Sequence, residues 1–154
     1  MISMNRYPEA IAYLFFFLTL CLSSEAIGQT KTDSDRSKGI HFTEGRWKDI
    51  AAKAKESGKY IFVDAYTTWC GPCKLLKSKT FLEERAGAYF NAHFINYTVD
   101  TEKGEGIQLA EQWDVTAYPT LLFFNPEGKL LLQQVGFVNG DKLIEFGKQA
   151  KAKK

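Results

Sequence analysis

The chain has 154 residues, of which 45% are hydrophobic and 25% charged, and its formal net charge is +2. This length and composition are typical of one soluble domain with a hydrophobic core. A net charge so small and so evenly spread gives no support for nucleic acid or anionic lipid as a partner.

The N-terminal segment differs from the rest of the chain. An apolar run of 12 residues extends from Ile11 to Leu22 and is followed by small residues. A membrane span needs about 20 apolar residues, so the run fits a secretory signal better. Ala26 and Gly28 stand at the −3 and −1 positions of a cut before Gln29. We therefore expect residues 1–28 to be a cleaved signal peptide of an exported, periplasmic protein, with an uncleaved membrane anchor as the alternative.

The next segment is polar and has no periodicity, which predicts a flexible lead-in over residues 29–40 and a folded domain over 41–154. Cys21 lies inside the apolar run and follows Leu20 rather than the small residue of a lipoprotein signal. We expect it to be removed with the signal peptide, which leaves two cysteines in the mature protein.

The mature chain alternates between helical and strand patterns. Trp47, Ile50, Ala51 and Ala54 share one face of a helix that Gly58 ends. The segments that follow in chain order are a strand "YIFVDAY", helices "CKLLKSK" and "EERAGAYFNAH", a strand "FINYTVD", a helix "GEGIQLAEQW", strands "TLLFF" and "KLLLQQV" around a turn "NPEG", and a last helix "GDKLIEFGKQAKA" with Leu143, Ile144 and Phe146 toward the core. Strands joined through helices predict an α/β fold with parallel strands, an edge hairpin and helices on both faces.

Cys70 and Cys73 follow the first strand and allow three interpretations. A structural disulfide that closes so short a loop removes little chain entropy, roughly 2 kcal/mol. A zinc site needs about four ligands, and His41 and His93 do not have the spacing of a zinc finger. The third interpretation is a disulfide that opens and closes during a reaction.

The redox interpretation assigns a role to each position around the pair. Cys70 stands where a strand ends and a helix begins, so unpaired N–H groups and the helix dipole favour its thiolate and make it the attacking sulfur. Cys73 lies one turn further in and would resolve the mixed disulfide. Pro72 is tolerated in a first helical turn. Trp69 either shields the pair or packs in the core.

Asp64 interrupts the apolar strand, where a carboxylate is not expected without a reason. It either faces water at the strand end or is buried beneath the cysteines. In the second case desolvation raises its pKa, and the carboxyl can accept and return the proton of Cys73.

At this point the chain resembles the thioredoxin family, from Trp47 to about Ala150. "WCGPCK" matches the family's active-site motif, Asp64 stands six residues before its first cysteine, and "VTAYPT" matches the loop that carries a cis proline. The "VGF" segment at Gly136 is similar to the glycine segment beside the active site. The resemblance implies a thioredoxin fold, a cis Pro119 and a redox-active disulfide with no added cofactor or metal. It also implies that Trp69, Gly71, Pro72, Tyr118 and Pro119 contact the substrate.

Two departures from the family pattern are visible. Cytosolic thioredoxins carry a lysine near the buried aspartate, at the position where this chain has Asn96, so the proton path is expected to differ. The segment from Ser78 to Gly106 is longer than its thioredoxin counterpart and resembles exported domains of membrane-linked thiol reductases.

The sequence therefore predicts an exported, monomeric thiol–disulfide oxidoreductase that reduces exported proteins and receives electrons from a membrane-embedded thiol donor. Cys70 attacks, Cys73 resolves and Asp64 moves the proton. The alternatives are an oxidase or isomerase with the same site, and a thioredoxin-fold binding protein or chaperone with idle cysteines.

Overall fold

The computed structural model describes residues 38–153. Their helices are α2 (Trp47–Ser57), α3 (Gly71–Ser78), the short 3-10 helix η2 (Thr80–Leu82), α4 (Glu84–His93), α5 (Gly106–Gln112) and α6 (Gly140–Ala152). The strands are β1 (Tyr60–Tyr66), β2 (Phe94–Asp100), β3 (Thr120–Phe124) and β4 (Leu130–Val135). Within this range, no helix is both long and apolar enough to cross a membrane. The predicted signal peptide, residues 1–28, lies outside the described residues.

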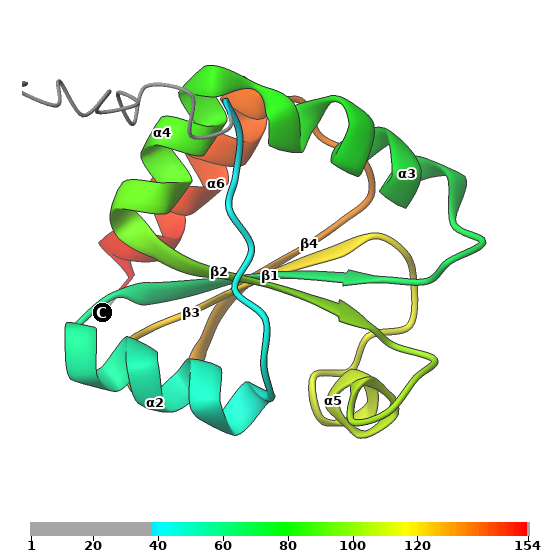
Figure 1. Cartoon of the computed structure of the whole chain (residues 1–154), viewed down its shortest axis with the longest axis horizontal. Coiled ribbons are helices and arrows are strands. Elements are labelled where there is room, and N and C mark those ends of the chain that lie inside the picture. Colours follow the sequence, from blue (N-terminus) through cyan, green and yellow to red (C-terminus); the bar gives the residue numbers. More distant parts are fainter. Residues whose placement is uncertain (1–37, 154) are drawn as a thin grey trace, which may run out of the picture. The chain divides into compact units, whose positions relative to one another are not determined.

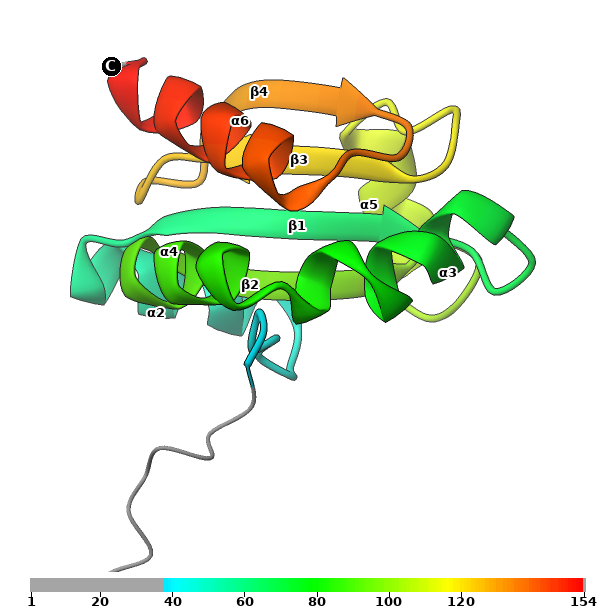
Figure 2. The same ribbon diagram turned by 90° about the horizontal axis from the view of Figure 1, so that it is seen from above.

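The four strands form one mixed sheet in the order β2-β1-β3-β4, which can be followed in Figure 2. β1 and β2 are parallel, with Asp64 opposite Thr98 and Tyr66 opposite Asp100. β3 is antiparallel to β1 and to the edge strand β4. The residue pattern alone predicted parallel strands plus a hairpin. The structure adds that β3, although it follows a helix, runs against β1.

Helices cover both faces of the sheet (Figure 1). Figure 1 shows α3, α4 and α6 on one face and α2 and α5 on the other. Even-numbered residues of β1, such as Phe62, point to the first face, where they pack with Leu76 of α3 and Phe90 of α4. Odd-numbered residues, such as Val63, pack on the second face with Ile50 of α2. This arrangement confirms the predicted thioredoxin fold.

Local signals in the sequence explain where elements end. Gly58 caps α2 in the left-handed conformation, with φ of 65°, which glycine adopts at little cost. The turn between β3 and β4 is closed by the N–H of Gly128, which donates to the carbonyl of Asn125 at 2.9 Å. Leu143 and Ile144 of α6 are buried as predicted, whereas Phe146 is only partly buried against the core.

The domain begins slightly earlier than predicted. Gly39 and Ile40, assigned to the flexible lead-in, are buried. The N–H of Ile40 donates to the carbonyl of Phe81 at 2.7 Å. A side chain on Gly39 would come within 2.6 Å of that same carbonyl oxygen. The polar composition of the preceding residues concealed this contact, because it depends on one apolar side chain and a close backbone approach.

Candidate active site

The two cysteines stand at the junction of β1 and α3. Cys70 is the N-cap residue of α3, and its Sγ accepts a hydrogen bond from the N–H of Cys73 at 3.1 Å. Pro72 occupies the first turn of the helix, as predicted. The two sulfurs form a disulfide bond of 2.02 Å. Cys70 is 3% exposed and Cys73 1% exposed, so both sulfurs lie just below the surface at a helix N-terminus.

Asp64 is fully buried on the sheet face that α3 covers. The alternative in which it faces water is therefore excluded. Its Oδ2 accepts a hydrogen bond from the hydroxyl of Thr98 at 3.1 Å, while Oδ1 has no partner among the described residues. Burial raises the pKa of Asp64 to about 6, against smaller lowering effects from Lys77 and from the Thr98 hydrogen bond. Such a carboxyl can take up and release a proton near neutral pH.

Asn96, the residue at the position of the family's lysine, does not reach Asp64. Its side-chain amide donates to the carbonyl of His41 and to Oδ1 of Asn91, both at 3.1 Å. Asn96 therefore fastens the segment before α2 to the edge of the sheet. The sequence analysis named position 96 as a departure from the family pattern. In the structure its asparagine makes hydrogen bonds to His41 and Asn91.

Two residues that the sequence interpretation missed face Asp64 instead. Thr98 stands opposite Asp64 in the parallel register of β1 and β2. Lys77 comes from α3, and its Nζ lies 3.0 Å from the centre of the Tyr66 ring. Its position four residues after Cys73 was the available signal, because residues at i and i+4 share a helix face.

The loop before β3 lies beside the glycine segment. The Tyr118–Pro119 peptide bond is cis, which confirms the expectation drawn from the family. The carbonyl of Pro119 accepts a hydrogen bond from the N–H of Gly136 at 2.8 Å. Within residues 38–153, the backbone N–H and carbonyl of Tyr118 have no hydrogen-bond partner. An extended chain could pair with them as with a strand edge.

The exposed side of the site carries Trp69, which is 64% exposed and so does not belong to the core. Its indole N–H donates to the two carboxylate oxygens of Glu102 at 2.9 and 3.1 Å. The ring meets that of Tyr118 edge-on, with centroids 5.9 Å apart. A side chain on Gly71 would meet no atom within 4 Å. Packing within the chain thus does not require glycine there, and the space beside the disulfide stays open.

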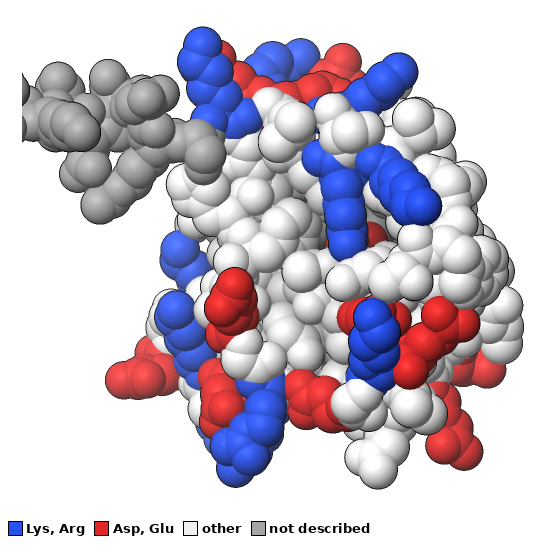
Figure 3. Space-filling view, turned by 45° about the vertical axis from the view of Figure 1, so that its right-hand side comes forward, with Lys and Arg blue, Asp and Glu red and all other residues white. Residues whose placement is uncertain are grey.

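The surface on this side has no dominant charge. Figure 3 turns the right-hand part of Figure 1 toward the reader, and acidic and basic side chains are interspersed there among uncharged ones. The residues that the structure describes contain no group of three or more His, Cys, Asp or Glu side chains that could hold a metal ion.

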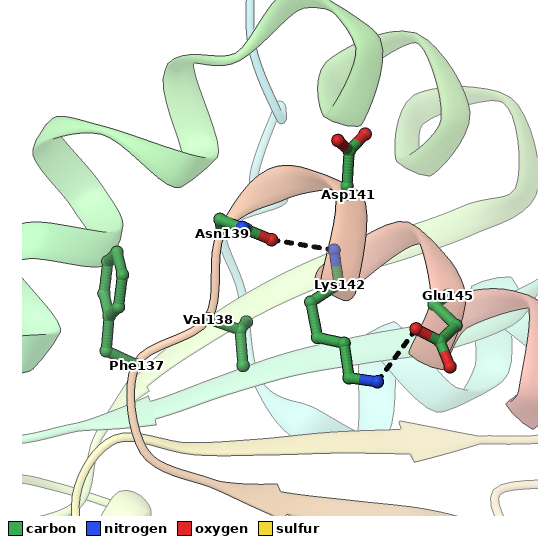
Figure 4. A pocket seen from close by; sticks show the side chains of 6 residues that line it. All are labelled: Phe137, Val138, Asn139, Asp141, Lys142 and Glu145. Atoms are coloured by element: carbon green, nitrogen blue, oxygen red, sulfur yellow. Dashed lines mark hydrogen bonds and ion pairs between the residues drawn. The ribbon is translucent and has the colours of Figure 1, made fainter.

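A pocket beside α6 has a volume of about 550 Å³. Figure 4 shows Phe137 at one side of it and Asp141, Lys142 and Glu145 on the helix. Lys142 pairs with Glu145 at 2.8 Å, and Asp141 with Arg85 at 2.7 Å. Neither cysteine nor Asp64 lines the pocket, and each of its charged side chains is already in an ion pair, so we assign it no chemical role.

Comparison with known proteins agrees with this geometry. The sequence pattern of the thioredoxin-like domain family matches residues 47–151. The solution structure of a "putative disulphide-isomerase" from Bacteroides thetaiotaomicron is 40% identical, covers 75% of this chain and 96% of its own, and superposes with a TM-score of 0.67.

Two curated relatives extend the comparison. Thioredoxin H-type 2 of Nicotiana tabacum is 36% identical over 98 residues, 64% of this chain and 76% of its own length. Protein disulfide-isomerase of Ricinus communis is 26% identical over 95% of this chain. The match spans only 28% of that larger protein.

Proposed function

This chain belongs to the thioredoxin-like family, and on that premise we propose that it is a thiol–disulfide oxidoreductase that reduces disulfide bonds in exported proteins. The observation that carries the proposal is the set of three features around α3. A disulfide stands at the helix N-terminus, a cis-proline loop offers free backbone groups, and the one buried carboxylate of residues 38–153 lies on the face that α3 covers.

The reaction starts from the reduced pair. The Cys70 thiolate attacks one sulfur of the substrate disulfide, that S–S bond breaks, and the departing sulfur takes a proton from solvent. Cys73 then gives its proton to the Asp64 carboxylate and attacks Sγ of Cys70. The second substrate sulfur leaves and is protonated, and the Cys70–Cys73 disulfide forms. Two electrons pass from the cysteine pair to the substrate.

The substrate is held by the exposed part of the site. An extended segment pairs with the backbone of Tyr118 next to Pro119, while Trp69 and the open space over Gly71 and Pro72 accept its side chains. Free backbone groups at Tyr118 and the 64% exposure of Trp69 support this placement. The protein acts as a monomer and needs no added cofactor.

The direction of electron flow follows from the Gly71-Pro72 pair. Neither residue brings a positive charge or a side-chain donor to Cys70, so the thiolate is only modestly stabilised and the protein is a reductant. An exported reductant needs electrons from another compartment, and we propose a membrane-embedded thiol donor. N-terminal sequencing of the exported protein should begin at or near Gln29, whereas an intact Met1 on a membrane-bound form would contradict export with cleavage.

A disulfide isomerase is the second candidate. The 40% identity to the Bacteroides thetaiotaomicron protein and the Tyr-Pro pair at positions 118–119 favour it. The same residues would act, but the mixed disulfide would be resolved within the substrate rather than by Cys73.

Insulin reduction and a redox titration test the proposal together. We expect the mature domain to reduce insulin in the presence of dithiothreitol and to have a potential nearer to about −270 mV than to about −120 mV. No insulin reduction would favour a binding protein with idle cysteines. A potential near the upper value would favour an oxidase, and refolding of scrambled ribonuclease without net reduction would favour the isomerase.

A further inference from the structure

The buried carboxylate of the site needs a partner that the family's lysine position does not provide. Asp64 has one oxygen bound to Thr98 and one with no partner among the described residues. Asn96, where the lysine would stand, makes its donor contacts to His41 and Asn91 instead. A buried carboxylate that must ionise during each turnover is costly without a nearby positive charge.

Lys77 is placed to supply that charge from the helix side. It lies one helical turn after Cys73, and its Nζ stands 3.0 Å from the centre of the Tyr66 ring. Tyr66 is two residues after Asp64 on β1, so both point to the face covered by α3. The ring face attracts the ammonium group and holds it over the end of the strand.

The other charged groups near this point are already engaged. Asp100, opposite Tyr66 in the register, pairs with Lys103 at 3.3 Å and accepts the N–H of Glu102 at 3.1 Å. Burial lowers the pKa of Lys77, and the negative charges of Asp64 and Asp100 oppose that shift by favouring its charged form. Within residues 38–153, Lys77 and Asp64 are therefore the cation and the carboxylate of this cluster that have no ion pair, and Asp100 already has Lys103.

A pocket that is open to solvent lies beside this cluster and is lined by two of its members, though not by Asp64 itself. It has a volume of about 280 Å³ and is lined by Lys77, Thr98 and four apolar residues, Ile40, Phe42, Phe81 and Leu82. Water occupies about 30 Å³ per molecule, so the space accommodates several. The two polar side chains of its lining are the two that face Asp64.

We propose that Lys77 is the positioning residue that keeps Asp64 in its proton-accepting state, and that the pocket between Lys77 and Thr98 is the route by which the proton then leaves. This inference rests on the proposed function. It assigns the role of the lysine that the family carries on the strand to Lys77 of α3. In each turnover Cys73 would give its proton to Asp64 from above, and the pocket would return it to solvent.

Lys77→Met tests the inference, because methionine keeps the length of the side chain and removes the charge. The pKa of Asp64, followed by the carboxyl carbon signal in protein with labelled aspartate, should rise by about 0.5 to 1 pH unit. The acid limb of the rate of mixed-disulfide resolution should move by the same amount. The variant would then be about three- to tenfold slower below the pKa and equal to wild type at high pH.

Two further variants make the result specific. Lys77→Arg should restore the wild-type profile, because it keeps the charge over Tyr66. Lys79→Met removes a charge two residues further on, from a side chain with no ion pair or hydrogen bond in the described part of the chain, and should leave both profiles unchanged. Thr98→Val should raise the pKa of Asp64 as well, through loss of the hydrogen bond.

The readouts separate this inference from the proposed function. The carboxyl titration needs no turnover, so a wild-type protein that fails to reduce insulin would overturn the proposed function alone. The inference is overturned if Lys77→Met and Lys79→Met have the same Asp64 titration and the same acid limb.

Discussion

The two faces of the sheet are built from the same strands but bury different kinds of side chain. On the face under α2 and α5, Trp47 packs against Trp113 and Phe124, with centroids 4.8 and 4.9 Å away. The face under α3, α4 and α6 has a similar aromatic cluster around Phe62, yet it also buries Asp64. Asp64 is the one charged side chain buried within residues 38–153.

The difference shows how one sheet can separate stability from reactivity. Both faces supply apolar burial, which is the main favourable term in folding. Only the face that α3 covers bears the cost of a buried carboxylate. The proposed function accounts for that cost, because it uses Asp64 as the proton acceptor for Cys73. Substitutions on the two faces should therefore have similar effects on the free energy of unfolding and different effects on the pKa of Asp64.

The largest effect should come from the cysteines. Cys70→Ser should abolish turnover and trap no substrate, because the attacking sulfur is lost. Cys73→Ser should also stop turnover but accumulate a covalent mixed disulfide, since attack still occurs and release does not. Non-reducing gels with mass spectrometry measure the trapped species. Equal trapping by both variants would show that the attacking and resolving roles are wrongly assigned.

A matched pair of leucines tests the comparison of faces directly. Leu121 and Leu122 are neighbours on β3, both fully buried, and they point to opposite faces. Either change to alanine should lower the free energy of unfolding by about 2–5 kcal/mol. Leu121 stands opposite Asp64 in the register, so Leu121→Ala should also admit water and lower the pKa of Asp64.

Urea unfolding and the carboxyl titration measure the two consequences of the leucine changes separately. Leu122→Ala serves as the control, with the same loss of stability and no change in the titration. If both variants moved the Asp64 titration equally, the two faces would not be chemically separate.

Asp64→Asn should change how stability depends on pH. The pKa of Asp64 is raised from 3.8 to about 6, so the folded state holds a proton that the unfolded state has released. Stability therefore falls as pH rises from about 4 to about 6 and stays low above that, a loss of about 3 kcal/mol at 1.36 kcal/mol per pH unit. Asparagine does not titrate, so Asp64→Asn removes this pH-dependent loss of stability. It should also slow the resolution of the mixed disulfide near neutral pH.

Unfolding of the oxidised Asp64→Asn and wild-type proteins at several pH values provides the test. The variant should be the more stable one at pH 8, and its advantage should shrink toward pH 4. A constant difference across that range would mean that the Asp64 carboxyl has the same pKa in the folded and unfolded states. Turnover unchanged from pH 6 to pH 9 would remove its role as proton acceptor.

Much of this arrangement could be predicted from local signals. The periodicity around Ile50, the apolar run of β1 and the capping Gly58 are local, and the structure has these elements where the sequence placed them. The position of Cys70 at a helix start, and the option that Asp64 is buried, could both be inferred from the residue types within one short segment. The cis Pro119 came from the family resemblance alone, since a proline residue does not reveal its isomer.

The missed features depend on contacts between distant segments. From the sequence alone, Lys77 is indistinguishable from a solvated helix residue. Its contact with the Tyr66 ring depends on how α3 packs against β1. Thr98 becomes a partner of Asp64 only through the register of two parallel strands, and Glu102 becomes one for Trp69 only through the loop after β2. Periodicity gives the face of a residue within its own element, but it does not give the residue that meets it from another.

The smallest effect is expected at the exposed edge of the site, where neither face of the sheet is involved. Glu102 holds the indole of Trp69 through an exposed, charge-assisted hydrogen bond, which contributes about 0.5–1 kcal/mol at a solvated position. Glu102→Ala should leave Trp69 less ordered, so the KM for a protein substrate should rise about two- to fivefold while kcat stays the same. Glu127→Ala, in the turn at the far end of β3, is the matched control. A fall in kcat, or an unchanged KM, would show that Trp69 does not contact the substrate from this position.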